Sequence, residues 1–454
     1  MHVQIERALR DAVRSGRLAR GSAVPSTRTL AGDLGVSRGV IVEAYEQLVA
    51  EGYLASRPRS RTVVTEGGQI APAPVQERTP APPGFDFRPG LPDVTRFPRE
   101  EWGRCVRRVL RALRAEHLGY GDPRGAFELR AALADYLGRV RGVVGGPDRV
   151  IVCTGFAQAL GVIARALAGR GVRRLAMEDP GHPDQRRIVS DAGLVPIAVP
   201  VDDRGLRVDL LDRVDAQAAL VSAAHQFPTG SVLAPERRHD LLAWAGRRDA
   251  VIVEDDYDAE YRYDRAPVGA LQGLAPDRVV YAGSASKILA PGLRLGWLVS
   301  PPALVGRAAE IKKYADLGTP ALEQLVYAEF LRSGELDRHL RRMRRTYGRR
   351  RDALLAALAR RCPGWKPQGA AAGLHLVVEL PRGLDEAAVT RHAATRSVRV
   401  YPLGEYRVAT HGPPALVLGY GGLAESAIRA GVSRLAASGQ GARRTRPGVP
   451  KKSG

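Results

Sequence analysis

The residues best suited to covalent chemistry lie in the segment GSASKILAPGLRLGW, residues 283–297. Its hydroxyls and its arginine, Ser284 and Arg294 among them, are groups that bind phosphate. Lys287 lies between them, and its amine can form an imine with an aldehyde, whereas a guanidinium cannot. Lys287 is also the only lysine in residues 1–311, although composition alone leaves open a surface lysine kept by chance. The pattern therefore predicts a Schiff-base site for pyridoxal phosphate, which carries both an aldehyde and a phosphate.

A second group of reactive side chains lies upstream, in AVIVEDDYDAEY, residues 250–261. The segment is typical of a buried strand that ends in carboxylates. An acid at such a strand end can pair with a protonated pyridine nitrogen, and we assign Asp255 to this role. Tyr257, two residues on, can hydrogen-bond the ring oxygen of the same ligand. The alternative is an acidic loop that binds a metal ion or water, which the adjacent acids would support if Lys287 stood alone.

Two further segments could complete such a site. Residues 150–165 predict a strand, a tight turn at Gly155 and a helix that begins near Phe156, and the first amides of a helix can hold a phosphate. One strand-glycine-helix turn is a weak indicator by itself. In EDPGHPDQR, residues 178–186, His182 stands where a flat side chain could stack on the ring.

These residues need a scaffold that brings strand ends together. Residues 85–437 alternate strand-like and helical runs, which is typical of an α/β domain with a mainly parallel sheet. The candidate strands include 150–153, 174–177, 218–221, 250–255 and 278–283. The acids of residues 250–261 and the turn at Gly155 each stand at the end of one of these strands.

Residues 1–64 show a different pattern, in which three short helices precede a basic pair of strands. Ser26 and Ser37 stand where they would cap the second and third helices. Gly35 makes the turn between these two helices. The segment YLASRPRSRTVV, residues 53–64, predicts two strands around a basic tip, a wing. The pattern favours a winged helix-turn-helix domain, which is mainly α.

In such a domain the start of the third helix enters the major groove of double-stranded DNA. Polar and cationic side chains on this helix, on the helix before it and on the wing are expected to contact bases or phosphates. They are Arg28, Ser37, Arg38, Arg57, Arg59 and Arg61. The alternative is a three-helix module that binds another protein, and the basic wing argues against it.

Composition and the remaining segments limit the choice of partners. The formal net charge of +21 favours a polyanion as partner, but only six of the 69 basic residues are lysine, a bias that GC-rich coding also produces.

The sequence predicts no membrane helix, no secretory leader and no metal site among its three cysteines, so a cytoplasmic protein is expected. Residues 65–84, rich in Pro and Ala, are typical of a flexible linker, and residues 438–454 of a disordered basic tail.

These motifs carry two resemblances. Residues 1–64 resemble the winged helix domain of GntR-type bacterial regulators. Six motifs resemble, in order and spacing, those of the fold-type I aminotransferases: GYGDPRG, EDPGHP, HQFPTG, EDDYDAEY, SKILAPGLRLG and GLHLVVEL. Taken together, residues 1–437 resemble the MocR/GabR family of transcription regulators, in which the two domains are fused.

The resemblance implies a role for each matching residue. Lys287 would form the Schiff base with pyridoxal phosphate, and Asp255 would pair with the pyridine nitrogen. The other contacts with the ring and the phosphate would come from Tyr257, His182, Ser284, Arg294, Gly155 and Phe156. Tyr120 would reach the phosphate from the partner subunit, since this fold builds its site at the interface of a homodimer.

The chain also departs from the family pattern. Phe156 and the alanine after it replace a hydroxyl and an amide side chain, so backbone amides would take over their phosphate contacts. His182 replaces a tyrosine and would stack less strongly. Residues 415–423, ALVLGYGGL, lack the arginine with which aminotransferases hold the substrate carboxylate, and Arg399 and Arg407 are candidate substitutes.

Three functions remain open at this level. The favoured one is a DNA-binding transcription regulator that responds to pyridoxal phosphate, alone or as an adduct with an amino compound. The second is a working aminotransferase with an auxiliary DNA-binding domain. The third is a DNA-binding protein whose large domain is only a scaffold for dimerisation, and the lysine, acid, tyrosine and arginine of the large domain argue against it. The missing carboxylate arginine argues against the second.

Overall fold

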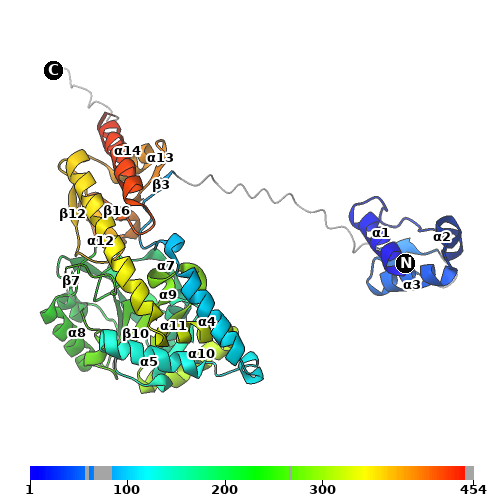
Figure 1. Ribbon diagram of the computed structural model, residues 1–454, viewed down its shortest axis with the longest axis horizontal. Coiled ribbons are helices and arrows are strands. Elements are labelled where there is room, and N and C mark those ends of the chain that lie inside the picture. The colour runs from blue at the N-terminus through cyan, green and yellow to red at the C-terminus, as the bar shows by residue number, and fades with distance from the viewer. Residues whose placement is uncertain (57–60, 66–83, 265–267, 445–454) are drawn as a thin grey trace. The chain divides into compact units, whose positions relative to one another are not determined.

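The computed structural model describes residues 1–56, 61–65, 84–264 and 268–444. The chain divides into two compact units, Met1–Ala81 and Pro82–Gly454, and each is described by itself (Figure 1). Among the described residues no helix has both the length and the apolar character needed to cross a membrane. In the same ranges no three His, Cys, Asp or Glu side chains gather as metal ligands would.

The first unit has the winged helix arrangement that the sequence predicts. Its elements are α1 His2–Arg14, α2 Thr27–Leu34, α3 Arg38–Ala50, β1 Leu54–Ala55 and β2 Val63–Val64. The Ser26 side chain caps α2 by accepting a hydrogen bond from the Thr29 amide at 3.1 Å. Gly35 ends α2 with a φ of 63°, a conformation that glycine adopts without steric cost. The turn lets the apolar residues of α3, Ile41 and Leu48 among them, pack in one core.

Two details of this unit bear on its polar surface. Ser37 occupies the N-cap position of α3, but contrary to the sequence prediction its side chain makes no capping hydrogen bond. Strands β1 and β2 pair antiparallel, with Leu54 opposite Val64, and form the predicted wing. Arg57 and Arg59, which the sequence places at its tip, lie outside the described residues.

The second unit is built on one large sheet. Its strands are β4 Val150–Cys153, β5 Arg174–Asp179, β6 Val195–Asp202, β7 Gly205–Leu206, β8 Ala218–Val221, β9 Val251–Asp256, β10 Val279–Ser284 and β11 Gly296–Val299. They lie in the order β4-β11-β10-β9-β8-β5-β6-β7. The five from β10 to β6 are parallel, as the sequence predicts, whereas β11 runs antiparallel between β10 and β4.

Helices cover both faces of this sheet, as the apolar strands require. Alternate strand residues point to opposite faces, so Val253 and Val280 pack with α6 and α10, while Ile252 and Val279 pack with α8. The helices between the strands and beyond them are α4 Arg99–Ala112, α5 Phe127–Arg141, α6 Phe156–Gly169, α7 Pro183–Asp191, α8 Pro235–Arg248, α9 Ala285–Ile288, α10 Pro302–Asp316 and α11 Ala321–Arg332. The fold is the α/β class that the sequence predicts.

A smaller antiparallel sheet follows the long helix α12, Glu335–Arg361 (Figure 1). Its order is β12-β13-β16-β15, with β12 Lys366–Gln368, β13 His375–Glu379, β15 Tyr401–Pro402 and β16 Ala415–Gly419. Helices α13 Glu386–Ala394 and α14 Glu425–Arg444 complete this part. A separate parallel pair joins β3 Phe85–Asp86 to β14 Val398–Arg399, so the start of the unit lies beside a segment more than 300 residues later.

Helix α14 corrects the sequence prediction of a disordered tail from residue 438. The helix continues to Arg444. Its buried stripe, Ile428, Val432, Leu435 and Ser438, keeps a helical spacing across the predicted boundary, so packing extends the ordered backbone. Residues 445–454 lie outside the described residues.

A buried ionic group ties α5 to the centre of the large sheet. The Arg141 Nε donates to the Oδ2 of Asp256 at 2.7 Å, and the Tyr281 hydroxyl donates to the same oxygen at 2.8 Å. All three side chains are buried, and Asp256 follows Asp255 on β9. Removing one partner of such a pair leaves a charge with neither water nor a counter-ion.

We therefore expect Arg141→Ala to lower the free energy of unfolding by about 3–5 kcal/mol. Arg139→Ala is the matched control, because Arg139 lies on the same helix and holds Asp337 at 2.8 Å at the surface. Exposed pairs contribute about 0–1 kcal/mol. Urea unfolding of both variants measures the difference, and equal losses would contradict the role given to the buried pair.

Candidate functional site

The predicted chemical residues meet at the carboxyl edge of the large sheet. A cavity of about 630 Å³ opens there, beyond the ends of β4, β5, β9 and β10. Eight of the residues that the sequence singles out line this cavity: Phe156, His182, Asp255, Tyr257, Ser284, Lys287, Arg294 and Arg399. The site therefore lies where parallel α/β sheets bind their ligands.

Lys287 lies on the short helix α9, directly after β10. The Ser284 hydroxyl caps this helix by accepting a hydrogen bond from the Ser286 amide at 3.0 Å. From the opposite side, Gly90 comes so close that a Cβ there would lie 3.2 Å from the Lys287 Nζ. Burial lowers the pKa of Lys287, against the pull of Asp258 and Asp255. The amine is therefore closer to its neutral, nucleophilic form than an exposed lysine.

Asp255 lies near the end of β9 and is almost completely buried. Its Oδ2 accepts a hydrogen bond from the Gln185 Nε2 at 2.8 Å. Its Oδ1 is buried too, and no described residue donates to it. Burial raises the pKa of Asp255 to about 8, with Gln185 opposing and Asp256 adding to the shift. A buried carboxyl with one unused oxygen is suited to a ligand that brings its own cationic N–H.

Tyr257 belongs to a buried chain of polar groups that the sequence interpretation missed. Its hydroxyl lies 3.1 Å from the Nδ1 of His225, and that Nδ1 lies 3.0 Å from the Oδ1 of Asp258. A carboxylate only accepts, so the Nδ1 of His225 carries the proton. The Tyr257 oxygen then accepts from His225, and its own O–H is free to donate to a ligand oxygen. His225 belongs to the motif HQFPTG, but from the sequence this segment predicted only a turn.

The turn after β4 provides the groups expected to bind phosphate. Gly155 is the N-cap of α6 and has a φ of 86°. The Arg294 guanidinium packs against it, so that a Cβ at Gly155 would lie 3.1 Å from its nitrogens. The Arg294 Nη2 donates to the Thr154 carbonyl at 2.6 Å. Phe156 begins α6 at the cavity wall. This side of the cavity therefore presents the Arg294 guanidinium and the first amides of α6, which are groups that bind phosphate.

His182 also lines the cavity, and contacts with its neighbours orient its ring. Its side chain caps α7 by accepting from the Asp184 amide at 3.3 Å. Its ring also lies 5.4 Å from that of Phe227, centre to centre. Burial lowers the pKa of His182, which favours the neutral imidazole. A neutral, oriented ring is available for stacking.

One of the two candidate carboxylate arginines lies in the cavity. Arg399 lines it together with Arg88, which the sequence interpretation did not single out. Both are near Asp86: the shortest contacts are 3.7 Å for Arg399 and 3.5 Å for Arg88. Arg407 instead donates to the carbonyls of residues 412 and 413 and lines a different cavity. The pairing of β3 with β14 brings Arg88 and Arg399 together.

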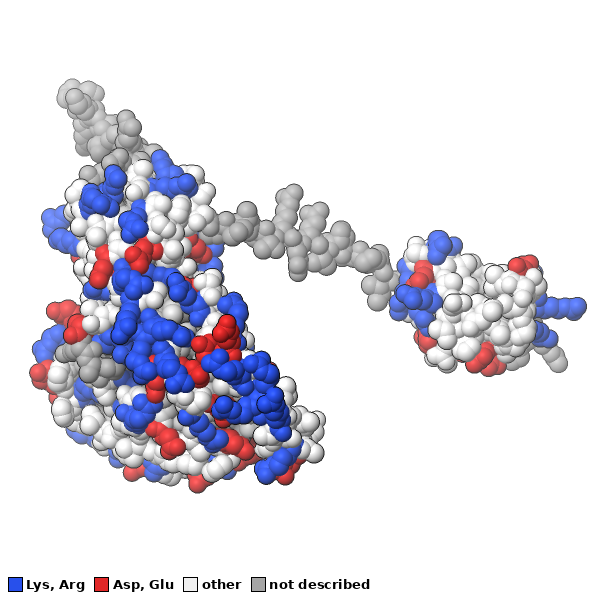
Figure 2. All heavy atoms as spheres, in the orientation of Figure 1, with Lys and Arg blue, Asp and Glu red and all other residues white. Residues whose placement is uncertain are grey.

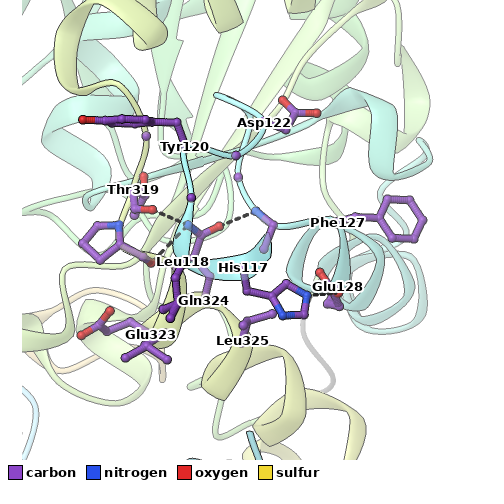
Figure 3. Close-up of a pocket in the computed structure, with 18 of the residues that line it drawn as sticks. His117, Leu118, Tyr120, Asp122, Phe127, Glu128, Thr319, Glu323, Gln324 and Leu325 are labelled. Carbon is purple, nitrogen blue, oxygen red and sulfur yellow. Dashed lines mark hydrogen bonds and ion pairs between the residues drawn. The ribbon is translucent and has the colours of Figure 1, made fainter. Parts of the chain in front are cut away.

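Tyr120 does not reach the Lys287 cavity of its own chain. Its side chain is 91% exposed and borders another cavity, of about 760 Å³. Figure 3 shows Tyr120 there beside Thr319 and Gln324, whose amide group bridges the carbonyl of Thr319 and the amide of Ala126. The expectation that Tyr120 serves the site of a partner subunit stays a prediction.

The winged helix unit presents its predicted contacts to solvent. Arg28, Ser37, Arg38 and Arg61 are all exposed. Arg38 begins α3, and its Nε donates to the Thr27 hydroxyl at 3.3 Å. This bond joins the starts of α2 and α3.

Comparisons with known proteins match both units. Residues 2–64 match the family of bacterial regulatory proteins called gntR, and residues 98–429 match aminotransferase class I and II. Among solved structures, alpha-aminoadipate aminotransferase LysN of Thermus thermophilus, complexed with N-(5'-phosphopyridoxyl)-L-leucine, superposes with a TM-score of 0.71 at 30% identity. The match covers 79% of this chain and 92% of that one.

Two curated relatives extend along almost the whole chain. The probable rhizopine catabolism regulatory protein MocR of Rhizobium meliloti is 34% identical over 96% of this chain and 93% of its own length. The pyridoxine biosynthesis transcriptional regulator PdxR of Corynebacterium glutamicum is 32% identical over 94% of this chain and 93% of its own. The chain therefore belongs to the MocR-type family of HTH-type transcriptional regulators, in which a gntR winged helix precedes an aminotransferase class I and II domain.

Proposed function

We propose that this protein is a transcription regulator that binds an operator in double-stranded DNA and responds to pyridoxal phosphate. The observation that carries the proposal is the unused, buried Oδ1 of Asp255 in the cavity of Lys287. An amine and an acid whose charges are both disfavoured by burial gain most from a ligand with an aldehyde and a protonated nitrogen. The same chain carries the winged helix that would convert this binding into a change at DNA.

The residues around the cavity match the parts of pyridoxal phosphate. Lys287 would hold the aldehyde, Asp255 the pyridine nitrogen and Tyr257 the ring oxygen, while His182 would stack on the ring. Ser284, Arg294, Phe156 and the turn at Gly155 would surround the phosphate. When bound, the cofactor supplies an aldehyde that can exchange between Lys287 and the amine of a second ligand.

The two cavity arginines point to the class of that second ligand. Arg88 and Arg399 share one carboxylate, Asp86, so the three side chains keep a net positive charge at the cavity wall. An amino compound that also carries a carboxylate would find its counter-ion there. The name of PdxR, a pyridoxine biosynthesis regulator, and the phosphopyridoxyl-leucine bound by LysN support a cofactor or cofactor-adduct signal.

We further propose that the regulator is a homodimer. Besides Tyr120, the cavity wall around it exposes Leu118, Phe127 and Leu317, each with more than half of its side chain open to solvent. An exposed apolar cluster of this kind is typical of a surface that another protein covers. A second copy placed there would receive Tyr120 near its phosphate-binding residues.

The second candidate function is an active aminotransferase with a DNA-binding appendage. Arg399 in the cavity is the observation that favours it, because transamination needs a firm grip on the substrate carboxylate. The shared Asp86 weakens that grip, so we expect turnover of common amino acids to be slow or undetectable. A keto-acid-coupled assay on the purified protein separates the two functions.

The cofactor assignment is tested at Lys287. Purified protein incubated with pyridoxal phosphate should show the visible absorption band of the lysine-bound cofactor, and Lys287→Ala should lose it while its circular dichroism is unchanged. Lys313→Ala, an exposed lysine on α10, is the matched control and should keep the band. A band that persists in Lys287→Ala would exclude the assignment.

The DNA-binding surface is tested at Arg38 and Arg61. Arg38→Ala should weaken operator binding and, if the side chain reads a guanine, lower discrimination at that base pair by about 1–3 kcal/mol. Arg61→Ala should weaken binding to every sequence and reduce the slope of log K against log salt by about 0.9. Fluorescence anisotropy across a salt series measures both, with Arg170→Ala of the large domain as the control. Unchanged binding in both variants would show that the protein does not use this surface.

A further inference from the structure

The large unit carries far more positive charge than its winged helix. Residues 85–437 hold 53 Lys and Arg against 40 Asp and Glu, an excess of 13. Two helices account for most of that excess: α4 and α12 together hold 15 arginines and five acids. A bias of the genome towards arginine would spread the charge over the whole surface. Figure 2 instead shows the blue side chains gathered along α12 and α4.

Two ion pairs show how these helices lie. Arg342 reaches Glu101 at 3.6 Å, and Arg104 reaches Glu335 at 3.4 Å. Residue numbers rise along α4 as they fall along α12, so the helices run antiparallel where they meet. Their exposed arginines recur at helical spacings of three and four: Arg104, Arg107, Arg108 and Arg111 on α4, and Arg338, Arg341, Arg342, Arg345 and Arg349 on α12. We call this set the arginine band.

The band keeps a surplus of charge after its internal pairs are counted. Glu101 and Glu335 pair with members of the band, Glu329 of α11 pairs with Arg108, and Glu425 of α14 pairs with Arg349. Four members form no ion pair with any described residue: Arg107, Arg111, Arg341 and Arg345. They stand as two pairs spaced i and i+4, an arrangement that repels and destabilises a helix. A polyanion bound along the band would remove that repulsion.

We propose that the arginine band is a second DNA-binding surface, one that holds the phosphate backbone of the duplex engaged by the winged helix. At 1.5 Å per residue, the stretch from Arg345 to the meeting point and on to Arg111 is about 20–25 Å long, or roughly six to seven base pairs of DNA. A second copy of the chain that bound through the same face would bring arginines next to arginines, and these like charges would repel. The inference rests on the proposed DNA-binding function and adds a second surface to it.

The test compares two fourfold variants of the full-length protein. The band variant is R107Q/R111Q/R341Q/R345Q. The control variant removes the same charge from exposed arginines without ion pairs elsewhere on the large unit, R165Q/R170Q/R213Q/R382Q. Each is titrated with a random-sequence duplex of about 60 base pairs across a salt series, and each phosphate contact contributes about 0.9 to the slope of log K against log salt. Circular dichroism confirms that both variants fold.

We expect the band variant to lose about 2–4 units of slope and the control variant to lose less than one. A winged-helix variant, R28Q/R38Q, should keep a salt-dependent residual binding that disappears when the band substitutions are added. Equal slopes for the band and control variants would overturn the proposal without affecting the proposed DNA-binding function of the winged helix. The partner of the arginine band would then be an acidic protein. If the wild-type chain bound neither this duplex nor the DNA upstream of its own gene, both proposals would fail.

Discussion

The structure depends on holding ionisable groups in a place where burial disfavours their charges. Asp255 lies at the end of a central parallel strand with one oxygen unused, and burial raises its pKa to about 8. Across the same cavity, burial lowers the pKa of Lys287. Gln185 reaches only the other oxygen of Asp255, and burial outweighs the attraction of Asp258 and Asp255 for a charged Lys287. Both groups are therefore suited to a ligand that supplies a cation to the acid and an aldehyde to the amine.

Much of the surrounding architecture serves to keep these groups in position. The pair of Arg141 and Asp256 braces the strand that carries Asp255. His225, oriented by Asp258, directs the hydroxyl of Tyr257. The cavity wall also joins distant parts of the chain, because β3 and β14 bring Arg88 beside Arg399. A ligand that shifts any of these contacts can alter DNA affinity, provided that it binds two arrangements of the protein differently.

The sequence predicted the parts that depend on local pattern. The strands, the Ser26 cap, the glycine turn and the places of Lys287 and Asp255 at strand ends all have signals within a few residues, whereas the predicted Ser37 cap was wrong. What it missed depends on contacts between distant segments. The role of His225 depends on its contact with Asp258, and that of Arg88 on its neighbour Arg399. The members of each pair are distant in sequence and are brought together by the order of the strands in the sheets. The extension of α14 was missed because the basic residues beyond 438 outweighed the apolar spacing that continues before them.

The most direct test of regulation by pyridoxal phosphate is a DNA titration on the region upstream of the protein's own gene, with and without the cofactor. The wild-type chain is compared with Lys287→Ala. We expect the cofactor to change the Kd of the wild type about 5–150-fold, the usual range of coupling between two sites, and to leave the variant's Kd unchanged. An unchanged Kd in both proteins, together with fast amino-acid turnover by the wild type, would contradict the account and identify the chain as an enzyme.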